Sequence, residues 1–531
     1  MKLKMMYCFL ALMIMLTLVS CSNESSNKEN SDNLNKEGMP IVDKKITLDF
    51  FAGKAPATHE DWNDVLIYNE YEDISNIDIN WEMVPFDSLS EKLNLALSGG
   101  SLPDAFHSAN ISSQDLLKYG EQGTLVPLND LIDEYAPNFK AILEEYPELE
   151  KSITLLDGNI YSFPLVVDPD FVSYRLGTTP WINEEWLEEL GMDMPKTTDE
   201  FYEYLKSAKN AEMGGKNGAP YGGADMHHLY TYLLGSFELG NKGIRNGNFD
   251  LDPQTGELRF FPLTEEYKEL VKYMHRLYSE ELIAQNIYSI DDSQYRSNVS
   301  DGIYGATNFW TPEGSIGKEA GEKFTNMPVL EGPNGGKEFV EFQPLAPNPG
   351  AFSITSDNEY PEATVRWIDY FYGDEGIKLY FMGVEGETYE VNEDGEIEYM
   401  DHILNSEEGL SLTQEQAKYL ALPGTNPPTI MKQEYFVGPA TTEPALEAAE
   451  TIEPDLVEDP WPDFIFDSDD VNTVESLGAD INKYVTEMRD KFITGEVSFE
   501  NWEEYSETIK AMGLDEYEEV IQNAIDKYNE Q

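Results

Sequence analysis

Cysteine is nearly absent from this sequence: the 531 residues contain two, Cys8 and Cys21. Cys8 lies in an N-terminal segment that we expect to be removed, and Cys21 follows that segment directly and is expected to be modified. The mature chain would then have no disulfide, no thiol nucleophile and no zinc site built on cysteine. Small disulfide-stapled scaffolds and cysteine-dependent enzymes are therefore excluded.

Basic residues are also few, with 35 Lys and Arg against 101 Asp and Glu, which gives a formal net charge of −66. A surface this acidic repels phosphate backbones, so we expect no nucleic-acid partner. The charge keeps the protein soluble, and we attribute it to a saline or alkaline exterior rather than to the ligand. It mildly favours neutral or cationic solutes over polyanions.

Common catalytic motifs are missing as well. We find no G-x-S-x-G, no H-E-x-x-H and no G-x-x-x-x-G-K-[ST], and GPNGGKE at 332–338 reads as a turn. Among 101 carboxylates some pair will always have the separation that glycoside hydrolysis requires, so carboxylates alone indicate no enzyme. We expect a protein that is not an enzyme and has no cofactor, and we keep a surface glycoside hydrolase or a non-catalytic surface lipoprotein as alternatives.

The N-terminus has the pattern of a secretory signal. Lys2 and Lys4 precede an apolar run that is too short for a good membrane span, and the segment Leu18-Val19-Ser20-Cys21 resembles the bacterial lipobox. We therefore predict a lipoprotein signal peptide at 1–20 and lipidation at Cys21; the alternative is an ordinary signal peptide followed by an incidental cysteine. Residues 21–44 are mostly polar and predict a flexible tether. No later segment approaches transmembrane length, so only the lipid would hold the protein to the membrane.

The region after the tether alternates between strand and helix patterns. Strand formers at 46–51 are followed by helical spacing at 62–69, an alternating strand at 77–84, and leucines every fourth residue at 89–97 before two glycines. This order predicts an α/β fold with mainly parallel sheets and flanking helices, in which a ligand binds at the carboxyl ends of the strands. About 490 residues follow the tether, too many for one hydrophobic core, so at least two lobes are expected.

A series of sequence blocks resembles one family in the family's own order. These blocks are SGGSLPDAF, GTLVPLNDLIDEYAPN, GNIYSFPLVVD, WINEEWLEELGMDMPKTTDEFYEYLKSAK, TEEYKELVKYMHRLYSEELI, YPEATVRWIDYFYGDEGIKLYFMGVEGETYE and FITGEVSFENWEEYSETIKAMGLDEYEEVIQNAIDKY. Together they resemble extracellular solute-binding proteins of carbohydrate ABC importers (family 1), in the large oligosaccharide-binding lipoprotein subgroup, over roughly residues 45–530.

This resemblance implies a two-lobed periplasmic-binding-protein-like fold of type II with a hinge. We place the N-terminal lobe at 45–168 plus about 345–405 and the C-terminal lobe at 169–344 plus about 406–531, with crossovers near 165–170 and 325–355. The resemblance also implies a monomer, lipid-anchored on the extracytoplasmic face of the cell membrane. It would close around an oligosaccharide and deliver it to the permease subunits of an ABC importer.

One segment departs from the family pattern. Thr198 is the expected N-cap of a helix that begins near Asp199, and many relatives place an EF-hand-like loop just after this helix. Here the loop reads NAEMGGKNGAPYGG, and Glu212 is its only carboxylate. Calcium requires six to eight oxygen ligands, several of them anionic, so we expect no metal site. The acidic segments 250–258 and 392–398 read as hairpin turns.

Sugars present apolar ring faces edged with hydroxyls, so their receptors combine flat aromatic side chains with short polar ones. At the end of an expected strand the chain carries Asn308, Phe309 and Trp310. The resemblance implies that Trp310 stacks on the ligand; the alternative is a tryptophan of the core.

Other candidates are assigned by their position in the family pattern. From the N-terminal lobe we expect ligand contacts by His107, Ser108, Asn110 and Lys54, although Lys54 could equally be an ordinary exposed lysine. From the C-terminal lobe we expect contacts by Asp225, His227 and Tyr230. Trp181, at the entry to the WINEEWLEELG block, and Trp461, in the PWPDF loop, are stacking candidates that could equally make no ligand contact, and Arg175 is the partner of any acidic sugar. The tryptophans expected in the core are Trp186, Trp367 and Trp502.

Overall fold

The computed structural model describes residues 33–530 apart from 216–217, 393–394, 396 and 422–425. The expected signal peptide at 1–20, the lipidation site Cys21 and the first half of the expected tether lie outside the described residues. The chain forms two compact units, which we call the first unit (up to Val166, and Asn348–Ile430) and the second unit (Val167–Pro347 and Met431–Gln531). The chain therefore passes from one unit to the other three times.

The second half of the expected tether is folded, which corrects the boundary at 44. Ile41 and Val42 are 0% and 1% exposed, and the Ile41 N–H donates to the carbonyl of Ser75 at 3.0 Å. Arg366 donates from its guanidinium to the carbonyl oxygens of Asn35 and Gly38. The apolar pair therefore anchors residues 33–44 to the first unit, and any flexible tether ends before residue 33.

The first unit is built on a six-stranded sheet with the strand order β14-β4-β11-β3-β1-β2. Its strands are β1 (Ile46–Lys54), β2 (Ile77–Pro85), β3 (Ala105–Ile111), β4 (Phe163–Val167), β11 (Asn348–Ile354) and β14 (Ile430–Met431). β1 pairs in parallel with β2 and β3, whereas β11 pairs antiparallel with both β3 and β4.

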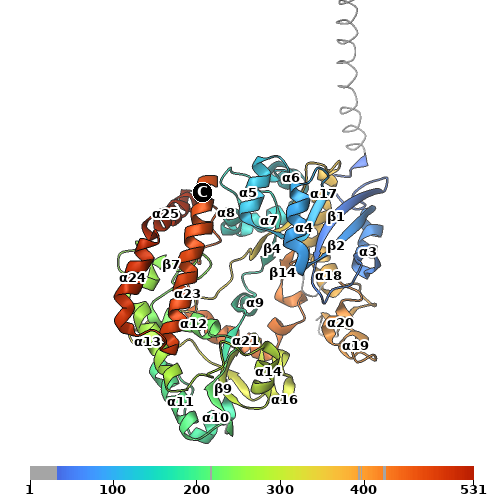
Figure 1. The fold of residues 1–531 in the computed structure, drawn as a ribbon. Coiled ribbons are helices and arrows are strands. Elements are labelled where there is room, and N and C mark those ends of the chain that lie inside the picture. Colours follow the sequence, from blue (N-terminus) through green and yellow to red (C-terminus); the bar gives the residue numbers. More distant parts are fainter. Residues whose placement is uncertain (1–32, 216–217, 393–394, 396, 422–425, 531) are drawn as a thin grey trace, which may run out of the picture. The chain divides into compact units, whose positions relative to one another are not determined.

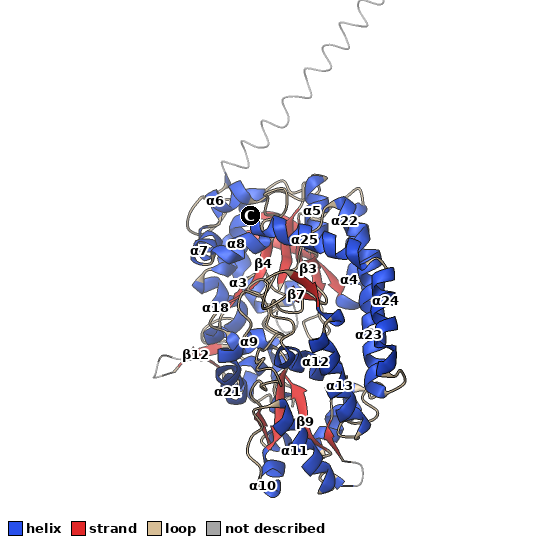
Figure 2. Cartoon of the chain, turned by 90° about the vertical axis from the view of Figure 1, so that its left-hand side faces the viewer, coloured by secondary structure: helices blue, strands red, loops and turns tan. Residues whose placement is uncertain are grey.

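Helices flank this sheet, and the first unit also contains a small hairpin (Figures 1 and 2). The helices are α3 (Leu66–Ser75), α4 (Phe86–Ser98), α5 (Ser113–Glu121), α6 (Asn129–Tyr135), α7 (Pro137–Glu145), α8 (Pro147–Ile153), α17 (Pro361–Asp369), α18 (Asp374–Met382), α19 (Asp401–Leu404) and α20 (Leu412–Gln416). The hairpin is β12 (Tyr389–Val391) and β13 (Ile397–Tyr399), as expected for the acidic segment near 392–398.

The second unit contains a four-stranded sheet with the order β10-β5-β9-β6. Its strands are β5 (Thr179–Asn183), β6 (Ala219–Tyr221), β9 (Tyr304–Phe309) and β10 (Phe324–Asn326), and the hairpin β7 (Phe249–Leu251) and β8 (Leu258–Phe260) confirms the turn expected at 250–258. The helices are α9 (Val172–Leu176), α10 (Glu184–Leu190), α11 (Thr198–Asn210), α12 (His227–Leu234), α13 (Glu265–Ser279), α14 (Asp292–Ser300), α15 (Pro312–Ile316), α16 (Lys318–Gly321), α21 (Glu443–Ile452), α22 (Ser468–Thr473), α23 (Ala479–Thr494), α24 (Trp502–Ala511) and α25 (Leu514–Glu530).

The two sheets are mixed rather than mainly parallel, which corrects the expected topology. In the second unit β5 pairs antiparallel with both β9 and β10, and only β6 and β9 run in parallel. A parallel pair requires a crossover connection within the same sheet, usually a helix. β11 enters the first sheet after the chain has left that unit and returned, so no such crossover sets its direction.

Two further boundaries differ from expectation. Residues 406–430, which the sequence assigned to the C-terminal lobe, belong to the first unit, because Thr58 Oγ1 donates to the carbonyl of Ala421 and Thr429 Oγ1 donates to the carbonyl of Phe371. The N-cap of α11 is Thr197 rather than Thr198, since Thr197 Oγ1 accepts from the N–H of Glu200 at 3.1 Å.

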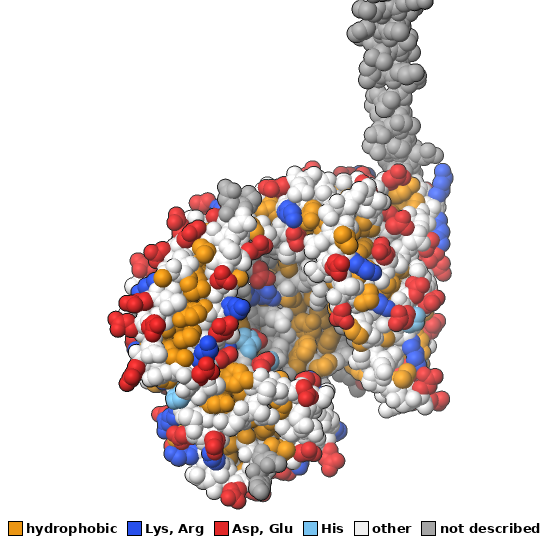
Figure 3. Space-filling view, in the orientation of Figure 1, with side chains coloured by type: hydrophobic (Ala, Val, Ile, Leu, Met, Phe, Trp, Pro, Cys, Tyr) orange, Lys and Arg blue, Asp and Glu red, His pale blue; other side chains and the backbone are white. Residues whose placement is uncertain are grey.

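The core tryptophans are placed as expected: Trp186, Trp367 and Trp502 are 6%, 1% and 6% exposed. Acidic side chains are spread over the visible face of the protein, and basic ones are sparse (Figure 3). In the described part of the chain, no helix is both long enough and apolar enough to cross a membrane.

Candidate functional site

The carboxyl ends of β1 and β3 lie together in the first unit, because the two strands are parallel neighbours with Ala52 opposite His107. Lys54 is the last residue of β1. Its ammonium group lies 2.8 Å from a carboxylate oxygen of Glu60 and 3.3 Å from the Glu60 carbonyl oxygen. The Lys54 side chain is 12% exposed, so the cation expected at this edge is largely covered and already paired.

His107 belongs to the interior of the first unit rather than to a ligand surface. It is 1% exposed, and its ring lies 5.4 Å from that of Trp62 and 5.3 Å from that of Trp81, both edge-on. Burial lowers the pKa of His107 to about 3, so the imidazole is neutral at physiological pH. Its Nδ1 lies 3.1 Å from Ser108 Oγ. Burial of the ring corrects its expected role as a direct ligand contact.

The backbone of β3 is strained where the strand ends. Ser108 and Asn110 have φ angles of 50° and 55°, which lie in the left-handed region. Asparagine adopts this conformation more readily than serine does. A Cβ on Gly53 would lie 2.3 Å from the carbonyl oxygen of Ser108, so β1 can approach this point only with glycine. Ser108 is fully buried, whereas Asn110 is exposed. Strain of this kind is concentrated at functional sites.

Two residues that the sequence reasoning missed join Asn110. The side-chain amides of Asn348 and Asn426 donate to Asn110 Oδ1 at 2.7 Å and 2.9 Å. Asn348 begins β11 and Asn426 precedes β14, so the three residues come from distant parts of the sequence. We call them the asparagine triad. The only local signal was the position of Asn348 between Pro347 and Pro349.

In the second unit, Trp310 lies directly after β9 in a cluster of aromatic rings. Its ring centroid is 5.4 Å from that of Tyr174 at 70°, and Tyr174 in turn lies 5.6 Å from Phe436 at 79°. The three rings are half-buried and rest on Val167, Phe171 and Ala440. We call Tyr174, Trp310 and Phe436 the aromatic cluster. Trp310 Nε1 is buried and forms no hydrogen bond with any residue that the structure describes.

The residues next to Trp310 are part of the core, which corrects their expected role. Every residue of β9 is buried. Phe309 is 4% exposed and packs on Tyr295, and the Asn308 side chain accepts a hydrogen bond from the hydroxyl of Tyr221 at 2.8 Å. Trp181 is 1% exposed, and its Nε1 donates to the carbonyl of Phe309 at 3.0 Å. A strand covered on both faces cannot present these side chains to a ligand.

Asp225 and His227 lie exposed at the start of α12. Asp225 accepts hydrogen bonds from the N–H of His227 and of His228 and lies 3.0 Å from the His228 ring, which together lower its pKa to about 2. Burial lowers the pKa of His227, whereas Asp225 raises that of His228. The two histidines are therefore in different environments.

Tyr230, one turn further on, is only 5% exposed. The guanidinium carbon of Arg489 lies 4.4 Å from the centre of the Tyr230 ring, and Arg489 Nε donates to Asp490 at 2.9 Å. Sequence reasoning missed Arg489, although it continues the buried spacing Ile481, Val485, Arg489 along α23.

The last two candidates are also engaged within the second unit. Arg175 Nε donates to the carbonyl of Gln343 at 2.9 Å, and its guanidinium lies 3.9 Å from the centre of the Phe342 ring. Trp461 is 8% exposed and packs on Phe464. Trp461 is a core residue. The contacts of Arg175 hold its side chain in place, so Arg175 is not a mobile cation.

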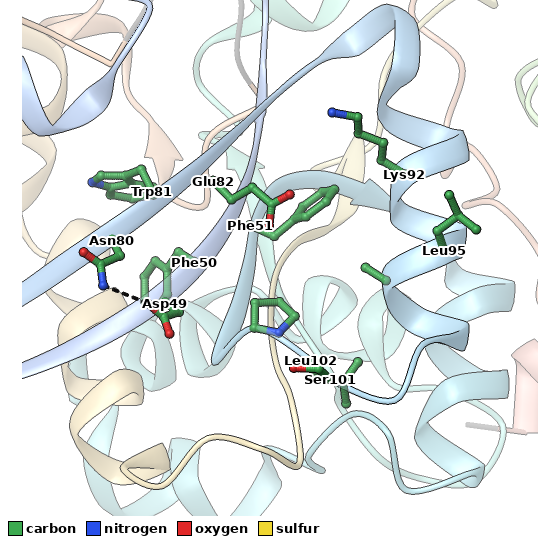
Figure 4. A pocket seen from close by; sticks show the side chains of 12 residues that line it. Asp49, Phe50, Phe51, Asn80, Trp81, Glu82, Lys92, Leu95, Ser101 and Leu102 are labelled. Atoms are coloured by element: carbon green, nitrogen blue, oxygen red, sulfur yellow. Dashed lines mark hydrogen bonds between the residues drawn. The ribbon is translucent and has the colours of Figure 1, made fainter.

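A cavity of about 850 Å³ opens in the first unit where β1 and β2 pass beside α4 (Figure 4). Its wall includes Asp49, which accepts a hydrogen bond from Asn80 at 2.8 Å, together with Glu82, Lys92 and Leu95. The lining residues of β1 and β2 lie in the middle of the strands. The cavity is therefore separate from the strand ends that carry Lys54 and Asn110.

The loop 210–223 closes through its own backbone, since the N–H of Gly215 donates to Glu212 and the N–H of Gly218 donates to Gly215. Residues 216–217 of this loop lie outside the described residues. Across the described part of the chain, no three His, Cys, Asp or Glu side chains gather in a geometry that could hold a metal ion.

Comparison with known proteins identifies the family. The chain matches the profile of the bacterial extracellular solute-binding protein family over residues 56–378, and it belongs to that family. It is 28% identical, over 96% of both chains, to the fructooligosaccharide ABC transporter substrate-binding protein FusA of Streptococcus pneumoniae. It is 24% identical to the polygalacturonan/rhamnogalacturonan-binding protein YtcQ of Bacillus subtilis, over 69% of this chain and 71% of that protein.

The structure agrees with this assignment. The solved structure of S. pneumoniae FusA in complex with kestose superimposes with a TM-score of 0.73 at 26% identity, covering 91% of this chain and 99% of that one. The expected resemblance to solute-binding proteins of carbohydrate importers and the expected two-lobed α/β fold class are both confirmed.

Proposed function

We propose that this chain is a substrate-binding protein that captures an oligosaccharide outside the cytoplasm and hands it to an ABC importer. The observation that carries the proposal is the aromatic cluster of the second unit, in a member of a solute-binding family. Trp310 directly follows a fully buried strand and packs edge-on with Tyr174, which in turn packs edge-on with Phe436. Such a cluster offers apolar ring surface at the end of a rigid strand, which suits the apolar face of a sugar ring.

The relatives support this proposal and leave the charge of the ligand open. FusA is named for fructooligosaccharides, which are neutral, and its solved complex contains kestose. YtcQ is named for polygalacturonan and rhamnogalacturonan, which contain acidic sugars. The class of ligand that we propose for this chain is therefore the oligosaccharides in general.

We further propose that the protein binds its ligand without changing it. Glycoside hydrolysis requires a carboxyl group that stays protonated as a general acid, which usually requires a raised pKa. Asp225, the exposed carboxylate among the site candidates, has its pKa lowered to about 2 by hydrogen bonds from His228 and the helix backbone. It is therefore ionised at physiological pH, so Asp225 itself is unsuited to protonate a leaving group.

The remaining parts of the proposal rest on the sequence and the family. They are a lipid anchor at Cys21 on the extracytoplasmic face of the cell membrane, a monomeric state, and docking onto two permease subunits. Capture would proceed by closure of the two units around the oligosaccharide, because a ligand that contacts both units stabilises the closed state. The expected sign of closure is a smaller radius of gyration in solution scattering when the ligand is added.

The test is a binding screen of the full-length protein in detergent against neutral and acidic oligosaccharides. We expect at least one oligosaccharide to raise the melting temperature and to change tryptophan fluorescence, and mass spectrometry to recover it intact. Steady conversion of the sugar to products would instead establish a hydrolase. Failure of every oligosaccharide to bind would favour a non-catalytic surface lipoprotein with another role.

A further inference from the structure

The asparagine triad of the first unit gathers three neutral amides at one edge of the sheet. Asn110 lies at the carboxyl end of β3, Asn348 at the start of the antiparallel strand β11, and Asn426 just before β14. Asn110 Oδ1 accepts from both neighbours, at 2.7 Å and 2.9 Å. Within the described part of the chain, Asn110 Nδ2 and the side-chain oxygens of Asn348 and Asn426 form no further hydrogen bond. Each side-chain nitrogen carries two hydrogens, so the triad presents two N–H bonds of Asn110, one remaining N–H bond each of Asn348 and Asn426, and the acceptor oxygens of Asn348 and Asn426.

The surrounding backbone is shaped to hold this arrangement. Ser108 and Asn110 both have positive φ angles, and the pairing of β11 with β3 shifts register between Gly350 and Phe352. A Cβ on Gly350 would lie 1.9 Å from the carbonyl oxygen of Ile111, so the two strands meet closely only because this residue is glycine. Bulges and left-handed residues redirect side chains at the ends of strands and are frequent beside binding sites.

The charge at this edge argues against an acidic ligand. A carboxylate only accepts hydrogen bonds, whereas a hydroxyl both donates and accepts. A carboxylate could accept from the unused N–H bonds of the triad, but it would leave the oxygens of Asn348 and Asn426 without a donor, whereas hydroxyl groups satisfy both kinds of group. The cation expected at the same edge, Lys54, already lies 2.8 Å from Glu60. Recognition of a carboxylate normally uses an available cation, most often a bidentate arginine.

We infer that Asn110, Asn348 and Asn426 form a subsite for sugar hydroxyl groups and select an oligosaccharide that carries no charge. The inference rests on the proposed function and narrows it, since it names the class of oligosaccharide and two specificity-determining residues, Asn348 and Asn426. The donor of Asn110 would meet a hydroxyl oxygen. The acceptor oxygens of the other two would receive hydroxyl hydrogens.

The experiment compares ligand classes and variants of the full-length protein in detergent by isothermal titration calorimetry. The ligands are neutral fructo-, gluco-, xylo- and manno-oligosaccharides, and oligogalacturonates and oligoalginates of the same lengths. The variants are Asn348→Ala and Asn426→Ala. The control is Asn405→Ala, which also removes an exposed amide of the first unit that makes one side-chain hydrogen bond, here to Asp401 at 2.7 Å.

We expect wild type to bind a neutral oligosaccharide and no uronate. Asn348→Ala and Asn426→Ala should each raise Kd for the neutral ligand by about 3- to 10-fold, the effect of losing a neutral hydrogen bond, and Asn405→Ala should leave Kd unchanged. Melting temperatures show whether each variant is folded. If one of the two triad variants is unfolded, the Kd of the other tests the inference. Preferential binding of uronates, or a wild-type Kd in a folded triad variant, would overturn the inference and leave the proposed function intact. Binding of neither class would overturn the proposed function itself.

Discussion

The two units carry different chemistry at the ends of comparable strands. In the first unit the parallel strands β1 and β3 end in small and polar residues, and the exposed group is an amide, Asn110, on a left-handed backbone. In the second unit β9 is followed directly by Trp310, which packs among aromatic rings. A sugar has both hydroxyl edges and apolar faces, so each unit matches one aspect of it. Under the proposed function, each unit would therefore offer a sugar a different kind of contact.

The interiors of the two units differ as well. The first unit buries a neutral histidine, His107, among aromatic rings, and burial lowers its pKa to about 3. The second unit buries a charged pair in which Asp250 accepts two hydrogen bonds from Arg259, at 2.6 Å and 3.0 Å, and a third from the N–H of Gly240. Protonation of His107 at low pH should therefore lower the stability of the first unit. The stability of the second unit depends on the presence of both Asp250 and Arg259.

The largest expected effect comes from breaking that ion pair with Asp250→Ala. Asp250 is fully buried, and its loss leaves the guanidinium of Arg259 without compensation, which should cost about 3–5 kcal/mol of unfolding free energy. Urea unfolding of the full chain measures this. The matched control is Asp292→Ala, which removes the exposed partner of Arg296 at 2.6 Å and should cost less than about 1 kcal/mol. Equal effects of the two variants would contradict the account.

The next largest effect is on binding, through the aromatic cluster. Trp310→Ala should weaken oligosaccharide binding by about 2 kcal/mol, or about 30-fold in Kd, because it removes the apolar surface on which a sugar ring would rest. Trp310→Phe keeps a ring and should lose clearly less. Calorimetry measures both values. A Kd for Trp310→Ala equal to that of wild type would remove the aromatic cluster from the proposed site.

The interiors should also respond differently to pH. The pKa of His107 is lowered from 6.5 to about 3 in the folded state, so the unfolded chain binds the extra proton. The first unit therefore loses stability as the pH falls below about 6.5, by roughly 2 kcal/mol at pH 5. His107→Leu cannot take up this proton, so its unfolding free energy should fall less between pH 7 and pH 5. Urea unfolding measures this free energy for wild type and His107→Leu at each pH. An equal decrease in the two proteins would show that other titratable groups control stability between pH 7 and pH 5.

The smallest expected effect is that of metal removal. In the second unit, loop 210–223 contains Glu212 as its only carboxylate, and its turn closes through backbone hydrogen bonds of Gly215 and Gly218. Calcium requires several anionic oxygens, so EDTA should leave the melting temperature of the protein unchanged within about 1 °C. A decrease of several degrees in the melting temperature, reversed by added calcium, would reveal a metal site that the account does not include.

Much of the fold could be predicted from local patterns. The strands near 46–51 and 77–84, the leucine-spaced helix before Gly99 and the hairpin at 250–258 all depend on contacts between nearby residues, and the structure contains each of them. Strand direction was less accessible. β11 joins its sheet after the chain has passed through the second unit, and the local sequence does not indicate whether the strand is parallel or antiparallel to its neighbours. The folding of residues 33–44 likewise depends on a distant partner, Arg366.

The candidate site was predicted only in part, because burial and partners decide which side chains are available. Asn110 is exposed and Trp310 is half-buried in a cluster, so both remain predicted ligand contacts. Phe309 and Trp181 have the same aromatic character in sequence, yet they lie in the core. The partners of Asn110 lie 238 and 316 residues away along the chain, so no spacing could indicate them.

The central claim is the proposal that the aromatic cluster and the asparagine triad each contact a neutral oligosaccharide. The most direct measurement is the Kd of that ligand for wild type, Trp310→Ala, Asn348→Ala and the double variant. We predict that the two losses of binding free energy add within about 0.5 kcal/mol, because the residues contact different parts of the ligand. A double variant that binds as well as Trp310→Ala alone would contradict the claim.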